Sequence, residues 1–179
     1  MKTAFLGASL AAIVGSVATA DVTFSFTNQT WTGFNFTEAY TAGSLAGTLT
    51  GATVNATLNA STNYTYADDL CVYVAGSPLA LGGKLQCGGF SNLNATQRYS
   101  WANGGSDAPG TPVTGTVNFT TGINMTASPT LSIWIGNGYG AAGTSGTWTG
   151  SITRLGVTPA PGAIALVGLA GLVGRRRRS

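Results

Sequence analysis

Several stretches within residues 21–157 alternate apolar and polar side chains with a period of two. Within residues 45–58, for example, Val54, Ala56 and Leu58 fall on one side of an extended chain, and polar residues fall on the other. Because successive side chains of a strand point to opposite faces, this pattern predicts strands with one buried and one solvated face. Charged residues, which include the best helix formers, make up only 7% of the chain. The pattern therefore predicts an all-β domain.

Short runs of β-forming residues recur between turns rich in Gly, Pro and Asn. The run at residues 70–74 is apolar almost throughout, which predicts a central strand. Eight or nine strands in one domain over residues 21–157 predict an antiparallel β-sandwich with a jelly-roll-like order. The strands are expected at residues 21–27, 31–36, 45–58, 70–74, 96–101, 113–119, 130–135 and 144–155.

Residues 1–20 have the features of a secretory signal peptide. Lys2 gives a positive start, an apolar stretch follows as far as Val17, and residues 18–20 (Ala-Thr-Ala) offer a cleavage site of small residues. We expect signal peptidase to cut before Asp21 and the remainder of the chain to be exported.

The formal net charge of +3 comes from the two ends of the chain. Lys2 and the arginines at 175–178 lie outside the predicted domain, which keeps Lys84, Arg98 and Arg154 against five acidic residues, a net charge of −2. The domain has no basic patch interleaved with aromatic residues, so the sequence argues against nucleic acid as a partner.

The last 22 residues consist of a Pro/Gly motif, an apolar run and a cluster of arginines. The apolar run at residues 163–174 would be about 18 Å long as a helix, shorter than a hydrocarbon core of about 30 Å. The arginines would resist translocation and stay cytoplasmic as a stop-transfer signal. The motif is Pro159, Ala160, Pro161 and Gly162, and the arginines are Arg175, Arg176, Arg177 and Arg178.

This tail, residues 158–179, resembles the PEP-CTERM sorting signal of bacterial surface proteins. Ala160 stands where the usual motif of that family has Glu, and the form found here is similar to a Pro-Ala-Pro variant. The resemblance implies export and transient retention in the membrane through the C-terminal hydrophobic helix. It also implies cleavage near the motif by an exosortase-type enzyme, and release to the cell surface or the outside.

Two further stretches, residues 63–73 and 143–152, resemble the P domains of proprotein convertases. The first is similar to an aromatic strand entry that contains Asp-Leu, and the second to a glycine-rich turn followed by a strand that bears a tryptophan. The resemblance implies a jelly-roll β-sandwich that is not itself catalytic.

The sequence contains no histidine. The absence removes the serine triad, histidine-bearing zinc sites and the commonest general base. Serine–lysine catalysis would need a motif before Lys84, but Ser77 is separated from it by a loop rich in Pro and Gly. We therefore predict that the protein is not an enzyme.

Cys71 and Cys87 are the two cysteines, and both lie in the part that we expect to be exported. In an oxidising compartment the sequence predicts an intramolecular disulfide between them. The alternative, a metal site, would lack ligands because two thiols without histidine do not complete one.

The adjacent carboxylates of Asp68 and Asp69 are the candidate metal ligands. On a loop they could share a Ca²⁺ ion, which takes six to eight oxygen ligands. Alternatively, Asp68 caps the turn into the following strand and Asp69 is solvated. No other cofactor is indicated.

Aromatic residues offer a second kind of site. They could form a platform that stacks on sugar rings, or they could fill the core. The residues in question are Trp31, Trp101, Trp134, Trp148, Tyr64, Tyr66, Tyr99 and Tyr139.

Together these features predict an exported, non-enzymatic protein of the cell surface or extracellular matrix, sorted by an exosortase-like system. The alternative is a secreted carbohydrate- or surface-binding module, with or without calcium, whose partner would be an extracellular polysaccharide. An exposed array of aromatic or threonine side chains would favour binding, whereas a fully buried aromatic set would favour a structural role.

Overall fold

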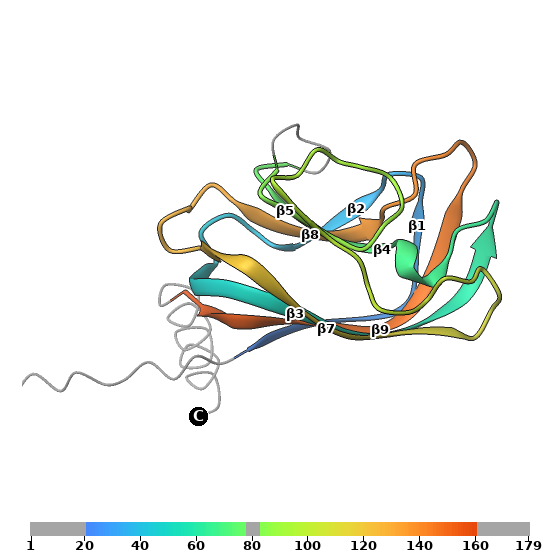
Figure 1. Cartoon of the computed structure of the whole chain (residues 1–179), viewed down its shortest axis with the longest axis horizontal. Helices are drawn as coiled ribbons and strands as arrows, with labels where there is room; N and C mark the ends of the chain where they lie inside the picture. Colours follow the sequence, from blue (N-terminus) through green and yellow to red (C-terminus); the bar gives the residue numbers. More distant parts are fainter. Residues whose placement is uncertain (1–20, 78–82, 161–179) are drawn as a thin grey trace, which may run out of the picture.

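The computed structural model describes residues 21–77 and 83–160, which form nine strands in two sheets (Figure 1). The neighbouring strands are antiparallel, apart from one parallel pair in the second sheet. The predicted all-β fold is confirmed. The predicted signal peptide, residues 1–20, and most of the predicted sorting segment, residues 161–179, lie outside the described residues. None of the described segments forms a helix that could cross a bilayer.

The four-stranded sheet has the strand order β1-β9-β3-β7. All of its neighbouring strands are antiparallel, and no two neighbours are consecutive in the chain. Its strands are β1 (Val22–Thr32), β3 (Leu45–Thr62), β7 (Thr111–Asn124) and β9 (Ser145–Pro159).

The five-stranded sheet has the order β2-β8-β4-β5-β6, in which β5 and β6 are parallel. A short 3₁₀ helix, η1 (Ala67–Asp69), leads directly into its central strand β4. Its strands are β2 (Phe36–Tyr40), β4 (Leu70–Ala75), β5 (Leu85–Cys87), β6 (Gln97–Tyr99) and β8 (Ser132–Asn137).

The two sheets form two layers, and the main core contains side chains from both (Figure 1). The predicted alternation in β3 is confirmed, because Val54, Ala56 and Leu58 are buried in this core. Strand β4 is buried along its whole length, as predicted. Its residues alternate between the main core, which contains Val72, and a second cluster on the other face of the sheet, which contains Tyr73. Burial on both faces explains its unbroken apolar sequence.

The outward face of the four-stranded sheet carries a row of threonines, one from each strand. Thr23 lies opposite Thr153, Thr153 opposite Thr53, and Thr53 opposite Thr116. The outer pairs are joined by hydroxyl–hydroxyl hydrogen bonds of 2.8 Å. Cross-strand pairs of this kind stabilise a sheet whose outer face is polar.

Strands β1, β3 and β7 extend further than predicted, and β5 was not among the expected strands. Two differences change the interpretation of the sequence. The strand expected at residues 31–36 does not exist as one element, because β1 ends at Thr32 and β2 begins at Phe36. At the other end, β9 continues past residue 157, where Pro159 lies opposite Leu45 of β3. The amide of Ala160 then donates to the carbonyl of Ser44 over 2.8 Å. The first half of the predicted sorting motif is therefore attached to the sheet.

The predicted disulfide is wrong in this structure, which holds Cys71 and Cys87 as free, buried thiols. Cys87 of β5 lies opposite Val72 of β4, and these two side chains face the main core. Cys71 is the next residue along β4, so it faces the second cluster on the opposite side of the sheet. The sheet itself separates the two thiols.

Candidate functional site

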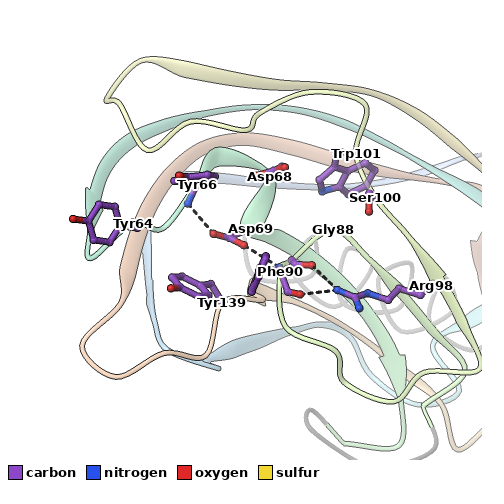
Figure 2. Close-up of a pocket in the computed structure, with 11 residues that line it drawn as sticks. Tyr64, Tyr66, Asp68, Asp69, Gly88, Phe90, Arg98, Ser100, Trp101 and Tyr139 are labelled. Carbon is purple, nitrogen blue, oxygen red and sulfur yellow. Dashed lines mark hydrogen bonds between the residues drawn. The ribbon is translucent and has the colours of Figure 1, made fainter.

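A pocket of about 540 Å³ lies at one end of the five-stranded sheet (Figure 2). Strand β4 is antiparallel to β5 and β8, and β5 is parallel to β6. The start of β4 and the ends of the other three strands therefore meet at the same edge. The pocket is lined by η1 and the segment before it, and by residues at the ends of β5, β6 and β8. Its volume falls within the range of about 300–1,000 Å³ that is typical of ligand sites.

Exposed aromatic side chains gather in this pocket. Among the described residues three large hydrophobic side chains are exposed, and all three line it: Tyr64 (74% exposed), Tyr66 (41%) and Phe90 (76%). Tyr139 also lines the pocket, and its ring contacts that of Phe90 edge to face at a centroid distance of 5.7 Å. An exposed apolar patch of this kind indicates an interaction site, because single exposed residues would be scattered over the surface.

A buried carboxylate connects two walls of the pocket. Asp69 at the end of η1 is 4% exposed. Its Oδ2 accepts the amide N–H of Tyr66 over 2.7 Å, and its Oδ1 accepts the amide N–H of Phe90 over 2.9 Å. Figure 2 shows this carboxylate between the two segments. Asp69 thus sets the distance between Tyr66 and Phe90.

The loop that presents Phe90 is held by three further bonds. Arg98 Nη2 donates to the carbonyl of Phe90 over 2.7 Å and to that of Gly89 over 3.3 Å. The amide of Gly89 donates to the carbonyl of Asp68 over 2.9 Å. The preceding Gly88 has φ +77°, and a Cβ there would collide with the carbonyl of Leu70. The loop can pass this close to β4 only with glycine at that position.

Tyr64 stands on a strained turn. Asn63 and Tyr64 have φ of 53° and 60°, a region that bulky residues seldom adopt. The turn is held by the side-chain amide of Asn63, whose Nδ2 donates to the carbonyl of Gly143 over 3.0 Å. Strain of this kind is typical of positions that present a side chain to a ligand.

The pocket is lined by two carboxylates, Asp68 and Asp69, and by one guanidinium, that of Arg98, so its formal charge is negative. Burial raises the pKa of Asp69 to about 6, although its two amide hydrogen bonds act in the opposite direction. Burial also raises the pKa of Asp68. No basic side chain is close enough to lower either pKa. With a pKa of about 6, Asp69 is mostly ionised at neutral pH in a partly desolvated site, which favours a ligand that compensates its charge.

The two aspartates have exchanged the roles that were expected under the capping alternative. Asp69, expected to be solvated, is buried and accepts the amide of Tyr66. Asp68 is only half-buried, and its carboxylate faces the pocket (Figure 2). Among the described residues no group of three or more His, Cys, Asp or Glu could hold a metal ion. Calcium binding by this pair stays a prediction.

Most of the predicted aromatic set falls into a core group and a pocket group. Three tryptophans belong to the main core, Tyr64, Tyr66 and Tyr139 line the pocket, and one of the core tryptophans, Trp101, also lines it. Of the remaining two, Tyr99 packs against the main core and Trp134 against the second cluster. Sequence reasoning did not select Phe90 or Arg98. The sequence signal for Phe90 was weak, since an aromatic residue directly after a glycine pair could equally well be an ordinary turn residue. The core tryptophans are Trp31, Trp101 and Trp148.

The predicted sorting residues lie apart from this pocket. Pro159 and Ala160 are at the end of β9, while residues 161–162 and 175–178 are outside the described residues. Comparisons of the chain with models of protein families, with curated proteins and with solved structures find no match. The pocket therefore has to be interpreted from its own chemistry: aromatic faces for stacking, carboxylates that accept hydrogen bonds, and one guanidinium.

Proposed function

We propose that the protein is an exported, non-enzymatic module that binds carbohydrate at the cell surface or in the extracellular matrix. The observation that carries this proposal is the gathering of Tyr64, Tyr66 and Phe90, the exposed aromatic side chains, in one pocket. Sugar rings present apolar C–H faces surrounded by hydroxyl groups. Aromatic rings cover such faces, and the carboxylate of Asp68 can accept hydrogen bonds from the hydroxyls.

The proposal includes a jelly-roll sandwich as the fold. The strand orders β1-β9-β3-β7 and β2-β8-β4-β5 support it, because consecutive strands alternate between the two sheets along most of the chain. Strand β6 adds an edge to the second sheet. Jelly rolls serve as lectin domains among many other roles, so the fold is compatible with sugar binding without indicating it.

Delivery forms the second part of the proposal. The signal peptide at residues 1–20 and the tail at residues 158–179 support export by signal peptidase, followed by sorting through an exosortase-type enzyme. The membrane would hold the precursor transiently through the apolar run at residues 163–174. Intact-mass spectrometry of the surface fraction should give a chain that begins at Asp21 and ends before Arg175. Recovery of the arginines in mature extracellular protein would overturn the sorting proposal.

Carbohydrate binding is tested with the exported protein on a glycan array, followed by calorimetry on the glycans that bind. Tyr64→Ala and Phe90→Ala should each weaken the Kd about tenfold, since aromatic anchors carry much of the free energy at such sites. The matched control is Thr116→Ala on the outer face of the four-stranded sheet, which should leave the Kd unchanged. Equal affinity for all three variants would contradict the assignment of the pocket.

A further inference from the structure

The ends of the pocket differ in charge. Tyr66 and Tyr139 lie beside the two aspartates, whereas Arg98 lies at the opposite end (Figure 2). The guanidinium of Arg98 donates from Nη2 to two loop carbonyls, so part of its hydrogen-bonding capacity is used to hold the loop. The aromatic end therefore combines ring faces with carboxylates.

The carboxylate of Asp68 is the group that is available to a ligand. Both oxygens of Asp69 already accept backbone amides, from Tyr66 and Phe90. The carboxylate of Asp68 accepts a hydrogen bond only from its own backbone amide within the described part of the chain. A half-buried carboxylate with this freedom can form a charge-assisted hydrogen bond to a ligand.

Three classes of glycan can be compared at this end. An acidic sugar would meet two carboxylates and would be repelled. A neutral sugar would bury Asp68 and Asp69 further without compensating their charge, which is costly. A sugar with an ammonium group would compensate that charge. The faces of aromatic rings attract cations as well, and the attraction is largest where water is excluded.

We propose that the pocket binds a glycan that carries a free amino group, with the ammonium between the carboxylate of Asp68 and the rings of Tyr66, Phe90 and Tyr139. This inference rests on the proposed carbohydrate-binding function and specifies the class of ligand. Recognition is non-covalent, and the remaining sugar rings lie along the exposed aromatic wall that includes Tyr64.

The test uses the exported protein and three oligosaccharides of equal length: an oligomer of glucosamine, its N-acetylated form and its N-trimethylated form. The trimethylated oligomer keeps its positive charge at every pH, so its pH profile reports the protein alone. Calorimetry should give a Kd about tenfold lower for the two cationic oligomers than for the acetylated one. Binding of the acetylated oligomer with equal or higher affinity would overturn the amino-group inference and leave carbohydrate binding intact. Failure of every glycan to bind would overturn both proposals.

Two variants test whether the carboxylate of Asp68 causes the preference for cationic oligomers. Asp68→Asn keeps the size of the side chain and should reduce the preference for the cationic oligomers to about twofold or less. The matched control is Glu38→Gln on β2, which removes one negative charge outside the pocket and should leave the preference unchanged. If both variants lowered the preference equally, general electrostatic attraction would replace the pocket as the explanation.

A pH series gives an independent readout. The affinity for the trimethylated oligomer should fall by about tenfold between pH 7 and pH 4. Protonation of Asp69 removes one negative charge as the pH falls through about 6, and protonation of Asp68, whose pKa burial also raises, removes the second. The other titratable groups that line the pocket are Tyr64, Tyr66, Arg98 and Tyr139. A flat profile from pH 7 to pH 4 would contradict the assigned role of the carboxylates.

Discussion

The four-stranded sheet is built from strands of 11 to 18 residues, whereas the five-stranded sheet is built from strands of three to six residues. Long strands satisfy most of their backbone groups in continuous ladders. Short strands leave longer connections whose backbone groups need other partners. Among the described residues, most of the buried polar side chains accordingly lie in the five-stranded sheet and the connections, and Arg154 of β9 is the exception.

In the five-stranded sheet, buried polar side chains hold the connections. Gln86 of β5 donates from Nε2 to the carbonyl of Ser91 over 2.7 Å, and its Oε1 accepts the amide of Leu93 over 2.9 Å. The carboxylate of Asp69 likewise accepts the amide N–H groups of Tyr66 and Phe90. In the four-stranded sheet, by contrast, the row of threonines lies on the solvent-facing side. The regular sheet thus acts as the scaffold, and the irregular one positions the pocket.

The largest expected effect is a difference in stability between a variant of the scaffold and a variant of the pocket. Trp148 of β9 is fully buried and donates from Nε1 to the carbonyl of Ala67 over 3.1 Å. Trp148→Ala should lower the free energy of unfolding by about 3–5 kcal/mol, because it leaves a large cavity. Phe90→Ala should lower it by less than about 1 kcal/mol, since the ring is exposed.

Urea denaturation followed by fluorescence measures both changes. The glycan-binding measurement should give the opposite ranking among variants that remain folded, with Phe90→Ala weakening the Kd. The control Thr116→Ala should leave the Kd unchanged and should lower the stability by at most about 1 kcal/mol, because it removes the hydroxyl bond to Thr53. Equal losses of stability for Trp148→Ala and Phe90→Ala would remove the distinction between scaffold and site.

The second prediction concerns pH and the buried carboxylate of the irregular sheet. Burial raises the pKa of Asp69 from 3.8 to about 6, so the folded state binds this proton more tightly than the unfolded state. The stability from this group is complete below pH 3.8 and is lost as the pH rises through about 6. The free energy of unfolding should therefore be about 2 kcal/mol lower at pH 7 than at pH 4 from this source.

The variant Asp69→Asn does not titrate in this range, so its curve of stability against pH should be flatter than that of the unchanged protein. The comparison uses the slope and not the absolute stability, because the amide also alters the bonds to Tyr66 and Phe90. Parallel curves for the two proteins would show that another group causes the pH dependence.

The scaffold could be predicted from sequence because its information is local. The alternation at residues 45–58 and the unbroken apolar run at 70–74 each specify burial within a few residues. The three-residue strands β5 and β6 are too short to show a period. The pocket depends on the pairing of these strands, since the order β4-β5-β6 brings Phe90 to Asp69 and Arg98 to the carbonyl of Phe90. That order is not encoded locally.

The positions of the cysteines also depend on strand pairing, and they give the third prediction. Their predicted pairing used their number and compartment, but the register of β4 on β5 decides which face each thiol occupies. Burial raises the pKa of both thiols. Reductant should therefore change the free energy of unfolding by less than about 0.5 kcal/mol, where loss of a disulfide would cost about 2–4 kcal/mol. Cys71→Ala should cost about 1 kcal/mol, for one buried group the size of a methylene.

Alkylation of the denatured, unreduced protein should label Cys71 and Cys87, and the native protein should react slowly at both. Non-reducing peptide mapping that joined the two fragments would contradict the pairing of Val72 with Cys87, and with it the strand arrangement that forms the pocket.

The smallest expected effect is that of calcium on thermal stability. Ca²⁺ takes six to eight oxygen ligands, whereas both oxygens of Asp69 are already bonded to amides and Asp68 supplies one carboxylate. Saturation at a hundredfold excess over Kd would stabilise the fold by about 2.7 kcal/mol, which would raise Tm by several degrees. We expect identical melting curves in millimolar calcium and in chelator. A rise that disappears in Asp68→Asn but persists in Glu38→Gln would instead make the pocket a calcium site, and the ammonium of a ligand would then compete with the ion for the same carboxylate.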